Sequence, residues 1–160
     1  MHCATVRTST SVADDSRSSH SASGTERGRP CVIGSALMTV MSEAEQHLML
    51  RTALRILENW QVRDDDARRI LGGVNRPTYA GWKVGVFDQV PDPILERVSA
   101  LIAIHKGLRM MFSDPDRGYG WMSRPNQLFG EMTPLGMISQ GEMDALTRLR
   151  EYLETQSQPW

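Results

Sequence analysis

The stretch from Asp92 to Phe112 constrains the fold of this chain more than any other. Its large apolar residues recur at spacings of three and four, which is typical of one face of a long helix. This stripe contains Ile94, Val98, Leu101, His105, Leu108 and Phe112, widened by Leu95, Ile102 and Met111. We expect Asp92 to cap the helix and Pro93 to open it. So broad an apolar face must be covered by other elements, and because strand signal is scarce we predict an all-α fold.

A helix is also predicted near the start of the apolar-rich part of the chain. Ser42 and Glu45 have the spacing of a capping box, which marks a helix N-terminus. The apolar stripe that follows contains Leu50, Ala53, Leu54, Leu57 and Trp60. We therefore expect this helix to run from just after Met41 to about Trp60.

Two short helices are predicted between these longer ones. "DDDARRILGG" indicates a helix with Asp64 as its N-cap and the glycine pair at its end. "NRPTYAGWK" indicates another, capped by Asn75, with Pro77 in the first turn and Trp82 packed into the core. A longer helix followed by two short ones around a glycine-containing turn is the order of a helix-turn-helix. A plain helical hairpin inside a bundle is the alternative.

The segment from Arg63 to Lys83 carries five basic residues and three consecutive aspartates. Consecutive helical residues point in different directions, so we interpret the aspartates as complementing a helix start rather than as a metal site. The rest of this segment is then predicted to be positive, which suits phosphates. The candidate DNA-binding residues are Arg68, Arg69, Arg76, Thr78, Tyr79 and Lys83.

The stretch "WMSRPNQLFGEMTPL", residues 121–135, is rich in large apolar residues but has neither helical period nor strand alternation. We interpret it as a broken helical connector, which follows a turn at "SDPDRGYG". Trp121, Leu128, Phe129 and Leu135 are expected to face inward, with breaks at Pro125, Gly130 and Pro134. A capping box at Ser139–Glu142 is then expected to begin a last helix, which buries Met143, Leu146, Leu149 and Leu153.

The first 41 residues are rich in Ser and Thr and poor in large apolar residues, so they are predicted to be disordered. An alternative is that translation begins at Met38 or Met41. We divide the chain into a leader (1–41), a helix-turn-helix domain (42–90), a second helical domain (91–156) and a tail (157–160).

Several function classes find little support in the composition. The net charge of −1 favours no polyanionic partner, and no apolar run approaches the roughly 20 residues that span a bilayer. Cys3 and Cys31 form neither a disulfide framework nor a zinc motif. The histidines are scattered, and we interpret His105 as a packed, hydrogen-bonded core residue. We therefore expect a cytoplasmic protein that is not an enzyme and holds no metal or cofactor.

Residues from Glu96 to Leu153 resemble the toxin-binding domain of the Xre/MbcA/ParS antitoxins. The resemblance rests on Glu96-Arg97, Trp121, Pro125-Asn126, Phe129-Gly130 and Pro134-Leu135. Members of the family also carry an Xre-like helix-turn-helix, which "DDDARRILGGVNRPTYAGWK" matches, with Trp82 in place. The residues that form the family motif, and that we expect to act as scaffold, are Trp82, Trp121, Pro125, Phe129, Gly130, Pro134 and Leu135. The leader and the tail lie outside the pattern.

The resemblance implies an antitoxin of a type II toxin–antitoxin system. Its partner would be a RES-domain toxin that consumes NAD⁺, and the antitoxin would cover the NAD⁺ cleft. The chain would form a homodimer within a toxin–antitoxin complex and, as some members do, repress its own operon by binding operator DNA. The residues that we expect to contact the toxin are Arg124, Asn126, Gln127, Glu131, Arg148, Arg150, Glu151 and Trp160. The alternative is a stand-alone Xre-like transcription regulator whose C-terminal domain only dimerises.

Overall fold

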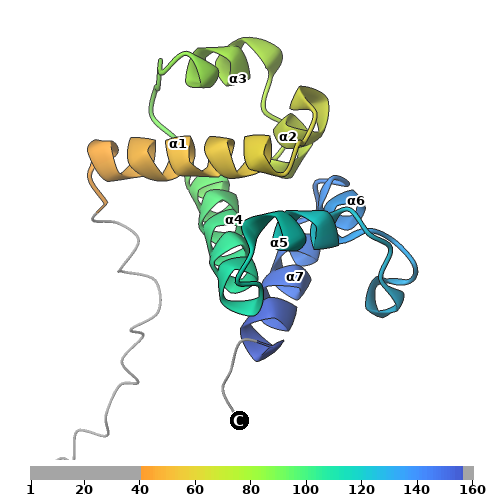
Figure 1. Ribbon diagram of the computed structural model, residues 1–160. Helices are drawn as coiled ribbons and strands as arrows, with labels where there is room; N and C mark the ends of the chain where they lie inside the picture. Colours follow the sequence, from red (N-terminus) through yellow and green to blue (C-terminus); the bar gives the residue numbers. More distant parts are fainter. Residues whose placement is uncertain (1–40, 157–160) are drawn as a thin grey trace, which may run out of the picture. The chain divides into compact units, whose positions relative to one another are not determined.

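Every regular element described by the computed structural model, which covers residues 41–156, is a helix (Figure 1). The all-α prediction is therefore confirmed over that range. Our expectations for the leader and for Trp160 lie outside the described residues. No helix within 41–156 is both long and apolar enough to cross a membrane.

Helix α1 (Glu43–Asn59) begins at the predicted capping box. The Ser42 hydroxyl accepts a hydrogen bond from the Glu45 N–H, while the Ser42 N–H donates to the Glu45 carboxylate at 2.8 Å. These hydrogen bonds from Ser42 hold the pKa of Glu45 below its ordinary value. The predicted apolar stripe, from Leu50 to Trp60, is buried.

Helices α2 (Asp64–Ile70) and α3 (Arg76–Lys83) occupy the predicted positions. Asn75 caps α3 as expected, because its side chain accepts from the Thr78 N–H. The prediction that Asp64 caps α2 is wrong. Arg63 holds the N-cap position without a side-chain hydrogen bond, and the Asp64 carboxylate instead pairs with Lys83 of α3.

Helix α4 (Asp92–Met111) lies between α1 and α7 and contacts both. Pro91, not Asp92, is its N-cap, so that prediction is wrong by one residue. Because neighbours cover several of its sides, α4 buries more than a single stripe. The buried residues are Leu95, Val98, Ala100, Leu101, Ile104, Gly107 and Leu108.

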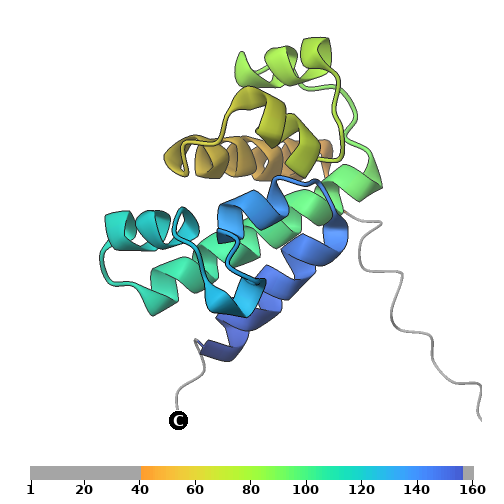
Figure 2. The same ribbon diagram turned by 90° about the vertical axis from the view of Figure 1, so that its right-hand side faces the viewer.

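Helix α7 (Met143–Gln156) runs parallel to α4 and packs along it (Figures 1 and 2). The two helices approach closely at Gly107, where an added Cβ would lie only 2.8 Å from the Cβ of Leu153. A parallel pair of neighbouring helices requires a crossover between them, and residues 112–142 provide it.

The crossover contains three short helical pieces. The "SDPDRGYG" segment was predicted to be a turn, but most of it forms helix α5 (Pro115–Met122), with Asp114 as N-cap and a proline at its start. The 3₁₀ helix η2 (Gln127–Phe129) and helix α6 (Pro134–Ile138) follow. Residues 121–135 are thus a broken helical connector, as predicted.

The predicted capping box at Ser139–Glu142 does not exist. Ser139 ends α6, and its hydroxyl donates to the carbonyl oxygen of Leu135 rather than capping α7. Gly141 adopts a φ of 86°, and an added Cβ would lie 2.8 Å from the carbonyl oxygen of Arg69. The chain therefore enters α7 through a glycine pressed against the end of α2.

Arg97, at the start of α4, joins the same two parts of the fold. Its Nη1 donates to the carbonyl oxygen of Ile70, at the end of α2, at 3.0 Å. The same nitrogen donates to the carbonyl oxygen of Gly141 at 2.7 Å. A guanidinium near helix-terminal carbonyl groups satisfies acceptors that the helix itself leaves open. Arg97 thus links the α2–α3 part of the molecule to the crossover that leads into α7.

Candidate functional site

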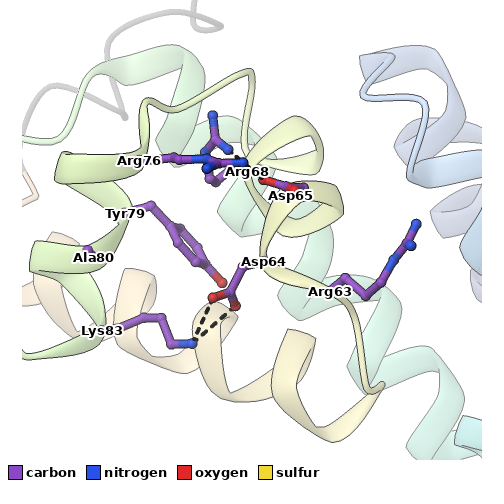
Figure 3. A pocket seen from close by; sticks show the side chains of 8 residues that line it. All are labelled: Arg63, Asp64, Asp65, Arg68, Arg76, Tyr79, Ala80 and Lys83. Atoms are coloured by element: carbon purple, nitrogen blue, oxygen red, sulfur yellow. Dashed lines mark hydrogen bonds and ion pairs between the residues drawn. The ribbon is translucent and has the colours of Figure 1, made fainter.

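Helices α2 and α3 enclose a cleft of about 390 Å³ (Figure 3). Its lining residues, which are mostly charged, are Arg63, Asp64, Asp65, Arg68, Arg76, Tyr79, Ala80 and Lys83. Arg76, Tyr79 and Lys83 come from α3 and face the aspartates at the start of α2 (Figure 3).

The aspartates of α2 pair with the basic residues around them. Asp64 lies 3.1 Å from the Lys83 ammonium group. Asp65 lies 2.8 Å from a guanidinium nitrogen of Arg68 and 3.2 Å from one of Arg76. The third aspartate, Asp66, pairs with Arg63 and Arg69. We expected the aspartates only to complement the helix start, leaving the rest of the segment positive, but all five basic residues lie in ion pairs.

Two candidate residues of α3 are less accessible than expected. Tyr79, a candidate DNA-binding residue, is only 6% exposed, and its side chain runs into the cleft toward Asp64 (Figure 3). Burial, together with the negative charges of Asp64 and Glu58, raises the pKa of Tyr79 to about 12. Thr78 is half-buried, whereas Arg76 and Lys83 remain at the surface. The cations at this cleft that can reach a phosphate are therefore those already paired with carboxylates.

A second group of residues gathers where the crossover meets α7. Trp121 stacks on Tyr152 of α7 with ring centroids 6.0 Å apart, and Phe129 meets Tyr152 edge-on at 5.5 Å. Phe112 lies beside Trp121 at 6.2 Å. Aromatic pairs at these distances stabilise a core beyond the area they bury. This cluster fixes the irregular segment 121–135 against α7.

The family-motif residues differ in burial, and Pro125 and Gly130, at the expected chain breaks, are exposed. Phe129, Pro134 and Trp82 are buried, and Trp121 and Leu135 are half-buried. Leu128 was expected to face inward but is 62% exposed. It precedes Phe129 in the 3₁₀ turn, and only one of the two neighbours can face the aromatic cluster.

The candidate toxin contacts lie on the segment 124–131 and on α7. Arg124, Gln127 and Glu131 are exposed. Asn126 is half-buried, and its side chain accepts from the Leu128 N–H, so it shapes the loop. Because Phe129 packs on Tyr152, this loop adjoins the part of α7 that carries the other candidates.

On α7, Arg148 and Glu151 are exposed. Arg150 is half-buried, with its Nε 3.5 Å from the Glu154 carboxylate. Among residues 41–156, no three His, Cys, Asp or Glu side chains are grouped to hold a metal ion. The surface offers charges, amides and apolar side chains suited to binding another macromolecule.

Sequence reasoning missed two residues that organise these surfaces. Tyr152 was not singled out, although an aromatic residue next to the buried Leu153 could have been. Arg97 was noted only as part of the family motif. Its spacing in the sequence could have identified it, because Arg97 shares a helical face with Leu101, Ile104 and Leu108, which are buried. A cation in line with such residues needs a polar partner.

Comparison with known proteins identifies the family of the C-terminal part of the chain. Residues 107–156 match the family described as the antitoxin Xre/MbcA/ParS C-terminal toxin-binding domain. An uncharacterized protein, y4oB, of Sinorhizobium fredii is 33% identical over 107 residues, which cover 67% of this chain and 82% of that protein. The chain is thus all-helical over residues 41–156 and carries a toxin-binding domain in its C-terminal part. It belongs to the Xre/MbcA/ParS family of antitoxins.

Proposed function

We propose that this chain neutralises a RES-domain toxin by covering the NAD⁺ cleft of that toxin. The observation that carries the proposal is the match of residues 107–156 to a toxin-binding domain. Inhibition would be steric and would require no chemistry from this chain. A stable complex of this kind buries on the order of 1,000 Å² or more in total.

Exposed basic residues beside the aromatic cluster support the proposal. Arg124 and Arg148 are exposed and can reach a partner, where a guanidinium can pair with carboxylates of the toxin. Gln127, Glu131 and Glu151 would then form a polar rim.

The test is co-expression with a RES-domain toxin encoded beside this chain, measuring cellular NAD⁺ and growth. Wild-type protein should preserve both and co-purify with the toxin. Arg148→Glu should weaken protection, whereas Arg55→Glu, an equal charge change at an exposed position of α1 outside the toxin-binding domain, should not. Loss of NAD⁺ despite well-expressed wild-type protein would contradict the proposal.

The contribution of the tail needs a carefully placed truncation. Leu153 is fully buried against Gly107, so a deletion from residue 150 onward would damage the fold. A chain ending at Gln156 removes only the tail, including Trp160. We propose that Trp160 adds to toxin affinity. Unchanged protection by the shortened chain would exclude the tail from the mechanism.

As a second function, we propose that the α2–α3 unit acts as a helix-turn-helix and binds operator DNA. The exposed cations Arg69, Arg76 and Lys83 favour this role, although each must leave an aspartate to meet a phosphate. Arg76→Ala and Lys83→Ala should weaken operator binding in a gel shift while toxin neutralisation stays intact. Unchanged affinity in both variants would rule out this face.

We also propose a homodimer. Val84 and Val86, which follow α3, are more than half exposed and lie near the half-buried Phe87. Sedimentation of the wild-type chain and of Val86→Asp would test it. The wild type should sediment as a dimer and the variant as a monomer, and a monomeric wild type would contradict the proposal.

A further inference from the structure

The loop from Asn126 to Met132 is closed by its own hydrogen bonds. The Asn126 N–H donates to the Met132 carbonyl oxygen at 3.1 Å, which joins the two ends. The Asn126 carbonyl oxygen accepts from the N–H groups of Phe129 and Glu131, at 2.9 and 3.2 Å. Its side chain accepts from the Leu128 N–H at 3.0 Å. Residues 130 and 131 both have positive φ, which completes the reversal of the chain.

Neighbouring residues of this loop have opposite roles. Phe129 is 6% exposed and packs edge-on against both Trp121 and Tyr152, which anchors the loop to the body of the molecule. Leu128 is 62% exposed, and Met132 is 43% exposed. Figure 1 shows the loop standing out from helices α5 and α6. An isolated exposed leucine is ordinary, but this one is held in a fixed position by a hydrogen-bonded loop.

A rigid loop that displays apolar side chains suits binding in a specific way. Ordering a flexible loop at an interface costs free energy, and a loop already in its bound shape avoids that cost. The exposed leucine and methionine are flanked by Gln127 and Glu131, which gives the apolar centre and polar rim of a protein interface.

We infer that Leu128 is the apolar anchor of the toxin interface, and that it inserts into an apolar socket on the toxin. The inference rests on the proposed function, because it takes the toxin as the occupant. The loop lies wholly within the matched toxin-binding domain, residues 107–156. This assignment places an apolar side chain, rather than the arginines of α7, at the centre of the interface.

Leu48 of α1 provides a matched control, because it is also 62% exposed and lies outside the toxin-binding domain. The experiment compares wild type, Leu128→Ser and Leu48→Ser as full chains. The toxin dissociation constant is measured by titration calorimetry, and protection by NAD⁺ loss in co-expressing cells. Circular dichroism verifies that each chain is folded.

Leu128→Ser should weaken toxin binding about 10- to 100-fold, the effect of exposing one buried leucine in a complex. Leu48→Ser should leave binding unchanged. Asn126→Ala, which loosens the loop but keeps the leucine, should weaken binding by a smaller factor.

Equal affinity of Leu128→Ser and wild type would overturn the inference, as would an equal loss in Leu48→Ser. Loss of self-association in Leu128→Ser with unchanged toxin affinity would also overturn it, because the occupant would then be a second copy of the chain. If folded wild type does not bind the RES-domain toxin at all, the proposed function fails first.

Discussion

At the scale of single residues, the ring of His105 lies in an unusually apolar environment between helices. Its ring stacks on Tyr119 and lies against Trp60, with centroids 6.0 and 6.4 Å away. We expected a hydrogen-bonded histidine, but its Nδ1 is buried without a hydrogen-bond partner, as is the Nε1 of Trp60. Burial, and secondarily the charge of Arg109, lowers the pKa of His105.

This environment predicts a pH dependence of stability. Because its pKa is lowered, His105 binds a proton less readily in the folded chain than in the unfolded chain, where a histidine has a pKa of about 6.5. The stabilising effect of neutral His105 is therefore complete above that pH and is lost as the pH falls below it. Urea unfolding of wild type and His105→Gln between about pH 5 and 8 measures the effect, which the variant should lack. Parallel pH profiles for the two chains would contradict it.

At the scale of elements, the ion pairs in the charged cleft indicate that aspartates limit the proposed DNA binding. Asp65 holds Arg68 and Arg76 in ion pairs, so it competes with phosphates for the same cations. Asp65→Asn should therefore raise affinity for duplex DNA severalfold. The slope of log binding constant against log salt concentration should steepen by up to about 0.9 for each cation that is released from Asp65 to a phosphate.

The control for this prediction is Asp144→Asn, an equal charge change at the exposed start of α7. It should alter neither affinity nor salt slope. The result that contradicts the competition is a wild type that binds DNA and an Asp65→Asn chain that binds it identically.

The elements also show how far sequence reasoning extends. Helices α1, α3, α4 and α7 were predictable because their apolar period or their caps are local signals. Helix α5 was missed because "SDPDRGYG" contains proline and glycines, yet Asp114 caps the segment and its apolar residues pack on the core. The outward direction of Leu128 depends on Tyr152, which lies in another helix, so no local pattern could reveal it. The ion pairs between α2 and α3 likewise join residues as far apart as Asp64 and Lys83.

At the scale of the whole molecule, Arg97 joins the end of α2 to the entry of α7, because it donates to the carbonyl oxygens of Ile70 and Gly141. Removing the Arg97 guanidinium takes one hydrogen bond from each of these two carbonyl oxygens. A hydrogen bond from a charged donor contributes about 1.5–3 kcal/mol. Arg97→Ala should lower the free energy of unfolding by roughly that amount or more. It should also increase hydrogen exchange at the end of α2 and around Gly141 together.

Denaturant unfolding and amide exchange by mass spectrometry check this expectation. Arg117→Ala, which removes an exposed arginine of α5, serves as the control and should change neither. Faster exchange at only one of the two sites in Arg97→Ala would mean that the arginine supports that site alone and does not join the two.

The close approach of α4 and α7 has a consequence for how this lineage can diverge. At Gly107 no room remains for even a methyl group, because the Leu153 side chain fills it. Substitutions at these two positions are therefore not independent events. Among descendants of a common ancestor, a larger residue at 107 should occur only with a smaller one at 153, and the order of those changes should be traceable. Paired substitutions of this kind would show that the spacing between α4 and α7 is kept while the side chains that set it change.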